Sequence, residues 1–159
     1  MKPYKPEKIF VERAVEDLPI TCSVLERLPE VPVERIDSRE SLLQEAQRWN
    51  PTLPRTKKSL ILAQHKGHFF KPCPGRRAKK GIKNVCCNYF VINYASNCHM
   101  ECSYCYLQSH LNFPYMIVYT NCGDLLSELQ AAFSENPYNF FRIGTGELAD
   151  SLALDLLTS

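Results

Sequence analysis

No stretch of this sequence is apolar for the ~18 residues that a membrane-spanning helix needs. The N-terminus, MKPYKPEKIF, has charges and prolines where a signal peptide has its apolar segment. An excess of one charge is also missing, because nineteen basic and seventeen acidic side chains leave +2. That balance neither requires nor excludes a nucleic-acid partner. We therefore expect a soluble, cytoplasmic protein, and a hydrophobic fraction of 45% argues against a mainly disordered chain.

Cysteine is too sparse for a disulfide scaffold. The eight cysteines are about one residue in twenty, below the ~8–10% of small disulfide-rich proteins. Without an export signal, disulfides are the weaker interpretation. In a reducing compartment, clustered cysteines more often hold a metal or take part in chemistry.

The first eighty residues predict a small α/β segment. Apolar runs indicate strands at 8–11 and 59–63, and alternating apolar and polar residues indicate a half-buried strand at 33–36. Helices are expected at 17–28 and 37–49. Asp37, with Glu40 three residues on, resembles the N-cap of the second helix. Residues 64–84 are rich in glycine, proline and basic side chains, and predict a loop or linker with a domain boundary near residue 80. We accordingly divide the chain into an N-terminal α/β extension with its linker, 1–80, and a second domain, 81–159.

The second segment alternates strands and helices. Strands are expected at 89–94, 116–120 and 140–143, and a cysteine-bearing loop at 95–105. Asn121 can cap a helix whose core-facing residues are Leu125, Leu126, Leu129, Ala132 and Phe133. A last helix is expected at 150–157, and its pattern has no stop signal, so we expect the N-terminal part of a longer protein.

This order implies a parallel sheet with right-handed crossovers. Functional loops of such sheets lie at the carboxyl ends of the strands. The cysteine loop and the stretch Gly144-Thr145-Gly146-Glu147 both fall there. We expect these two loops to face each other.

The strongest chemical signal is Cys98-x-x-x-Cys102-x-x-Cys105. Thiolates are the usual ligands of iron–sulfur centres, and three of them on a four-iron cube leave one iron open. An open iron suits chelation by the amine and carboxylate of an amino acid. S-adenosylmethionine offers both groups and a sulfonium that can accept an electron. The alternative is structural zinc, which takes four ligands and could use His99 or Cys122 as the fourth.

These residues resemble the radical S-adenosylmethionine superfamily, in which CxxxCxxC carries an aromatic residue before its last cysteine, here Tyr104. CSYCYLQ from Cys102, YTN from Tyr119 and RIGTGELADSLALDLLT from Arg142 are similar to the spore photoproduct lyase and DNA photolyase-like family. KPEKIFVERAVED, near the N-terminus, resembles the opening strand of that family.

The resemblance implies an N-terminal α/β extension followed by the first βα units of a partial (β/α) barrel. It also implies a 4Fe–4S cluster on Cys98, Cys102 and Cys105, and S-adenosylmethionine bound by Tyr104 and by a glycine-rich motif matched by residues 144–147. The expected reaction is hydrogen abstraction from a thymine photoproduct in DNA. Tyr104 and Tyr106 would complete the turnover, and a protein such as flavodoxin or ferredoxin would supply electrons. We expect the present chain alone to be inactive on substrate, because part of the barrel would be missing.

One position departs from the family. By alignment, the hydrogen-donating cysteine of the lyase falls on Glu147. Cys122 is a possible replacement. A radical enzyme acting on another substrate, such as a modified nucleoside or a peptide, and a zinc-stabilised nucleic-acid-binding module without catalysis are therefore kept as alternatives.

Two further groups remain open. Cys73, Cys86 and Cys87 could ligate a second cluster or zinc, or be merely reduced thiols. The basic run Arg76, Arg77, Lys79, Lys80 and Lys83 could contact DNA phosphates, with Phe69 and Phe70 as aromatic neighbours, or form a solvated loop.

Overall fold

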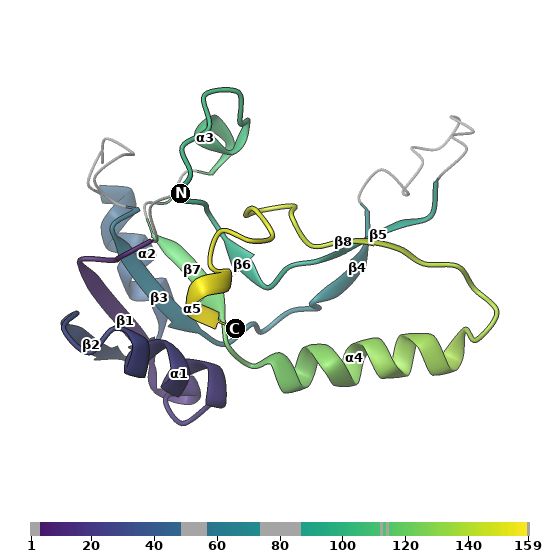
Figure 1. The fold of residues 1–159 in the computed structure, drawn as a ribbon, viewed down its shortest axis with the longest axis horizontal. Helices are drawn as coiled ribbons and strands as arrows, with labels where there is room; N and C mark the ends of the chain where they lie inside the picture. Colours follow the sequence, from purple (N-terminus) through teal and green to yellow (C-terminus); the bar gives the residue numbers. More distant parts are fainter. Residues whose placement is uncertain (1–3, 49–56, 74–86, 112, 114, 159) are drawn as a thin grey trace.

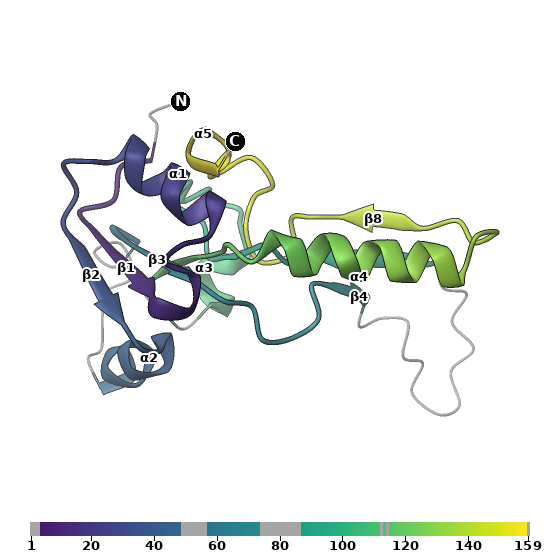
Figure 2. The same ribbon diagram turned by 90° about the horizontal axis from the view of Figure 1, so that it is seen from below.

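The chain folds into two sheets with helices packed around them (Figures 1 and 2). The computed structural model describes residues 4–48, 57–73, 87–111, 113 and 115–158. The elements in chain order are β1 (Lys8–Glu12), the 3-10 helix η1 (Arg13–Val15), α1 (Pro19–Arg27), β2 (Val33–Ile36), α2 (Arg39–Arg48), β3 (Ser59–Ala63), β4 (Phe70–Pro72), β5 (Tyr89–Ile92), β6 (Ala95–Ser96), α3 (Leu107–His110), β7 (Met116–Tyr119), α4 (Cys122–Glu135), β8 (Arg142–Gly144) and α5 (Asp155–Thr158).

The larger sheet has the strand order β2-β1-β3-β7-β6. Its first four strands are parallel, and β6 runs antiparallel to β7. The inner strands β1 and β3 carry continuous apolar runs, at 9–11 and 60–63, because helices cover both faces of the sheet. Ile9 and Leu60 belong to the core cluster on the α1 side, whereas Phe10 and Ile61 pack on the other face, where Leu42 of α2 joins them. Figure 2 shows α1 and α2 on opposite sides of these strands.

The smaller sheet has the order β4-β5-β8, with β5 and β8 parallel. Phe70 of β4 stacks on Phe90 of β5 with ring centroids 4.8 Å apart. Phe133 of α4 lies 6.1 Å from Phe70 and 5.2 Å from Phe141, centroid to centroid. These aromatic contacts pack α4 against one face of the smaller sheet. Figure 1 shows α4 running alongside β4, β5 and β8.

The predicted α/β class with a parallel sheet is confirmed. β3, before residue 80, pairs with β7, after it, so the segments 1–80 and 81–159 share one sheet. The predicted boundary itself lies outside the described residues, and the division into two domains stays a prediction. None of the helices among the described residues has the length and apolar character needed to cross a lipid bilayer.

Several local predictions were wrong. Ser38, and not Asp37, caps α2: its hydroxyl accepts a hydrogen bond from the Glu40 amide at 3.2 Å, while Asp37 pairs with Arg13 at 3.0 Å. Part of the predicted linker forms the three-residue strand β4, which pairs antiparallel with β5. Ala95 and Ser96 form β6 instead of beginning a loop.

The predicted helices of the second segment also differ. The apolar stripe of α4 is not core: none of its described residues is buried, and Leu126 is 60% exposed. Asn121 stands at the N-cap position without capping, because its side chain is hydrogen-bonded to the backbone of His65 and to Asp124. The final helix, α5, covers only the end of the predicted 150–157 segment.

Candidate functional site

Asn97 fixes the start of the cysteine loop. Its backbone is left-handed, with φ of 72°, and its side chain is buried. The side-chain amide donates to the carbonyls of Phe113 and Tyr115 at 3.1 and 3.3 Å, and Oδ1 accepts from the Cys98 amide at 2.9 Å. The Asn97 amide also donates to the Leu148 carbonyl at 2.8 Å. One asparagine therefore ties the loop to the segment before β7 and to the segment after β8.

The three motif cysteines share one short loop. Cys98, Cys102 and Cys105 are each half-buried and form no disulfide. Glu101 has a left-handed φ of 49°, and the Cys105 amide donates to the Cys102 carbonyl at 2.9 Å, which closes a turn. Free, partly accessible thiols on such turns suit an iron–sulfur cube, because each thiolate binds a different iron and the sulfurs need not meet at one point.

The zinc alternative gains no support from the geometry. Among the residues that the structure describes, no three His, Cys, Asp or Glu side chains are arranged to hold one metal ion. His99 stacks on Tyr4 with centroids 4.8 Å apart, and burial lowers its pKa. Cys122 lies on α4, where its thiol contacts the Tyr119 carbonyl at 3.8 Å.

The glycine-rich loop after β8 meets the cysteine loop, as expected, although the cysteine loop follows β6 and not β5. The Tyr106 hydroxyl donates to the Glu147 carbonyl at 3.1 Å. The Glu147 carboxylate, through Oε2, accepts from Asn93 Nδ2 at 2.9 Å and pairs with Lys71 Nζ at 3.3 Å. Asn93 is buried, and its Oδ1 has no hydrogen-bond partner among the residues that the structure describes. Glu147 is therefore held from β4, from the end of β5 and from the cysteine loop.

Tyr104 and Tyr106 are both accessible. Tyr104 is 89% exposed and Tyr106 59% exposed. A hydrogen bond with Cys102, followed by the charge of that thiolate, raises the pKa of Tyr104. The aromatic residue between the last two cysteines is thus open to a ligand.

Gly144 has a packing role that the sequence did not reveal. A Cβ there would lie 2.6 Å from Cζ of Tyr89, on the neighbouring strand, so the phenol of Tyr89 occupies this space. A Cβ on Gly146 would lie 3.2 Å from Ser151 Oγ, and that hydroxyl is hydrogen-bonded to Thr145 Oγ1 at 2.6 Å. Cofactor binding by residues 144–147 stays a prediction.

Lys71, Tyr89 and Asn93 were missed by the sequence analysis. The sequence could have indicated Asn93 as a site residue, since it is the polar residue near the end of an aromatic and β-branched run. Nothing in the sequence indicated Lys71, because the segment around it resembled a loop.

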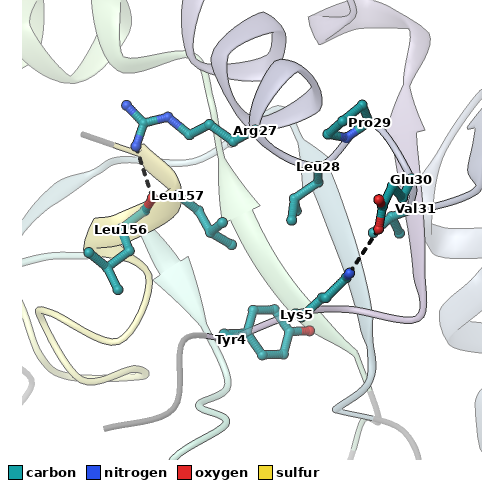
Figure 3. Close-up of a pocket in the computed structure, with 9 residues that line it drawn as sticks. All are labelled: Tyr4, Lys5, Arg27, Leu28, Pro29, Glu30, Val31, Leu156 and Leu157. Atoms are coloured by element: carbon teal, nitrogen blue, oxygen red, sulfur yellow. Dashed lines mark hydrogen bonds and ion pairs between the residues drawn. The ribbon is translucent and has the colours of Figure 1, made fainter.

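Two cavities border the site. One of about 480 Å³ lies between the N-terminal segment, α1 and α5, and Tyr4, which lines it, also stacks on His99 (Figure 3). There Arg27 donates to the Leu156 carbonyl at 2.9 Å. The other, about 310 Å³, is lined in part by Thr145 and Cys122, and burial raises the pKa of the Cys122 thiol.

The second thiol group is only partly described. The Cys73 amide donates to the Tyr89 carbonyl at 2.9 Å, and Cys87 is exposed. Cys86 and the basic run Arg76, Arg77, Lys79, Lys80 and Lys83 lie outside the described residues. Phe69 and Phe70 are buried, which removes them as stacking partners for bases.

Comparisons with known proteins agree with the motif analysis. No family model matches the sequence. A spore photoproduct lyase from Geobacillus sp. (strain Y412MC61) is 26% identical over 160 residues, a match that covers 99% of this chain and 44% of that protein. The solved structure of spore photoproduct lyase complexed with dinucleoside spore photoproduct matches with a TM-score of 0.75 and 21% identity. A variant of the lyase with bound AdoMet and dinucleoside spore photoproduct matches with a TM-score of 0.75 and 22% identity.

Each of these two matches covers 99% of the present chain and 44% of the chain in the solved structure. The chain thus spans less than half the length of the proteins it matches. The predicted resemblance to spore photoproduct lyase is confirmed, and at these identities the solved structures establish the fold.

Proposed function

Starting from this likeness to spore photoproduct lyase, we propose that the chain is the cluster-binding part of a radical S-adenosylmethionine enzyme that repairs thymine photoproducts in DNA. The observation that carries the proposal is the junction of the two loops. There Tyr106, on the loop that carries the three free thiols, donates its hydroxyl to the Glu147 carbonyl of the loop that follows β8.

Cys98, Cys102 and Cys105 would hold a 4Fe–4S cluster. The donor set fits, because three half-buried thiols that form no disulfide lie on one loop. Asn97 anchors one end of this loop and the Tyr106 hydroxyl anchors the other. When bound, the cluster supplies the electron that cleaves S-adenosylmethionine reductively. A small electron carrier such as flavodoxin or ferredoxin is the proposed reductant.

Tyr104 and the 144–147 loop would orient S-adenosylmethionine. Tyr104 is free to lie against the adenine because it is almost fully exposed. The Glu147 carboxylate would accept a hydrogen bond from the ammonium group. Lys71 and Asn93 already orient this carboxylate through Oε2, and Oε1 accepts no hydrogen bond from the described residues.

Tyr106 would pass a hydrogen atom during turnover. Its O–H points at the carbonyl of residue 147, the position that aligns with the hydrogen-donating cysteine of the lyase. The lesion would reach this junction flipped out of the duplex, which costs a few kcal/mol. The solved relatives bind dinucleoside spore photoproduct, which supports a DNA lesion as substrate.

Glu147 also favours a second candidate function. A carboxylate cannot donate a hydrogen atom as a thiol does, so the product radical needs another donor. Cys122 shares a pocket with Thr145 and is a candidate for that role. A radical enzyme acting on a modified nucleoside or a peptide would need no thiol at position 147.

The test is anaerobic reconstitution of the chain with iron and sulfide, followed by dithionite and S-adenosylmethionine. Formation of 5′-deoxyadenosine, abolished by Cys102→Ala and retained by Cys22→Ala, supports the proposal, because Cys22 is an exposed thiol on α1. Photoproduct-containing DNA is then given to the full-length protein, because the present chain alone is expected to be inactive on substrate. Repaired thymine supports a lyase, 5′-deoxyadenosine without repair points to another substrate, and no 5′-deoxyadenosine from iron-loaded chain contradicts the proposal.

A further inference from the structure

The small sheet has one face covered by α4 and another that faces the two-loop junction. Phe70 and Phe90 point toward α4, where Phe133 packs against Phe70. Because successive side chains of a strand point to opposite faces, Lys71 and Tyr89 lie on the other face. Lys71 confirms this, since it reaches Glu147, whose carbonyl holds Tyr106 of the cysteine loop. We call this the junction face.

Tyr89 lies across the junction face. Its ring leans over the neighbouring strand, where Cζ lies 2.6 Å from the position that a Cβ of residue 144 would take. Only glycine at 144 leaves this room. The ring therefore rests against the β8 backbone, and its opposite side is turned away from the sheet. Tyr89 is half-buried, which fits a ring covered on one side.

Arg142 stands beside Tyr89. The two residues are directly paired in the β5–β8 register, so their side chains share a face. Arg142 is exposed, and no ion pair of its guanidinium occurs in the described part of the chain. Lys71 adds a second cation to this face, 3.3 Å from Glu147.

We propose that Tyr89 and Arg142 form a nucleotide subsite in which a pyrimidine base stacks on Tyr89 and its phosphate binds Arg142. Aromatic side chains that lie on a sheet surface stack on unpaired bases. The planar guanidinium is suited to phosphate. The subsite lies on the same face as Glu147 and Tyr106, so a base stacked there is adjacent to the proposed reaction centre. This inference rests on the DNA substrate of the proposed function.

The experiment measures binding of a fluorescein-labelled oligothymidine to the cluster-free chain by anisotropy, over a series of salt concentrations. Tyr89→Leu is expected to weaken binding about 5- to 100-fold, whereas Tyr89→Phe, which keeps the ring, stays within about 2-fold. Arg142→Gln is expected to weaken binding and to lower the slope of log affinity against log salt by about 1. The matched controls are Tyr138→Leu, an exposed tyrosine after α4, and Arg35→Gln on β2.

Circular dichroism of each variant first establishes that it is folded. The proposal is overturned if the folded chain does not bind the oligonucleotide, if Tyr89→Leu matches Tyr138→Leu, or if Arg142→Gln matches Arg35→Gln. This readout is independent of the proposed radical chemistry, because the chain carries no cluster in the experiment. Failure of the subsite leaves 5′-deoxyadenosine formation unaffected. Conversely, a chain that binds thymidine through Tyr89 but forms no 5′-deoxyadenosine keeps the subsite and refutes the radical chemistry.

Discussion

Gly144→Ala tests the packing of Tyr89 against the glycine-rich loop. The new methyl group would overlap the phenol, since Cζ of Tyr89 lies 2.6 Å from the methyl position and Oη lies closer still. The ring must leave the sheet, and overpacking of this kind costs about 1–3 kcal/mol. Without the phenol, the same substitution meets no obstacle from residue 89. It then gains about 0.5–1 kcal/mol, because alanine loses less backbone entropy than glycine on folding.

The measurement is a double-mutant cycle of Gly144→Ala and Tyr89→Ala by urea denaturation followed by far-ultraviolet circular dichroism. We expect Gly144→Ala to destabilise the parent chain and to be neutral or stabilising with Tyr89→Ala, a coupling of about 2 kcal/mol. Gly123→Ala is the control, because nothing lies within 4 Å of its Cβ position. Equal costs of Gly144→Ala in the two backgrounds would refute the contact.

Two further predictions concern stability. Glu12 is 2% exposed and accepts the Arg39 and Gln64 amides at 2.9 and 2.8 Å, so Glu12→Gln, which leaves one amide without an acceptor, should cost about 2–4 kcal/mol. Glu7→Gln, at an exposed pair with a lysine, should cost under about 1 kcal/mol in the same denaturation assay, and equal losses would contradict this. Burial raises the pKa of Tyr4 above its usual 10.0, so the unfolded chain loses this proton first and the free energy of unfolding falls as pH rises above 10. Tyr4→Phe should make that fall shallower in denaturation curves taken across alkaline pH, and an unchanged slope would argue against it.

The sequence predicted the elements whose signals are local. The predicted strands at 8–11 and 59–63 contain the continuous apolar runs 9–11 and 60–63, and both runs are buried in the larger sheet. The meeting of the two loops was also predictable, because the carboxyl ends of parallel strands lie at one edge. The CxxxCxxC motif can be found without knowledge of the fold, since its three cysteines lie within one short stretch of sequence.

The rest depends on pairing between distant residues. β4 is three residues long and contains proline, so only its register with β5 identifies it as a strand. The contact of Tyr89 with Gly144 joins residues 55 positions apart and follows from the β5–β8 register. The prediction that the apolar stripe of α4 belongs to the core was wrong for a related reason. Periodicity shows that a helix has an apolar side, and it does not show how much of that side the neighbouring sheet covers.

The most direct test of the account is the cluster itself. Iron, sulfide and zinc are measured after anaerobic reconstitution of the chain, and the reduced sample is examined by electron paramagnetic resonance with and without S-adenosylmethionine. We predict about four irons per chain, lost in Cys98→Ala, Cys102→Ala and Cys105→Ala, and a spectrum that changes when S-adenosylmethionine binds the open iron. Stoichiometric zinc without iron, or a spectrum unchanged by S-adenosylmethionine, would contradict it.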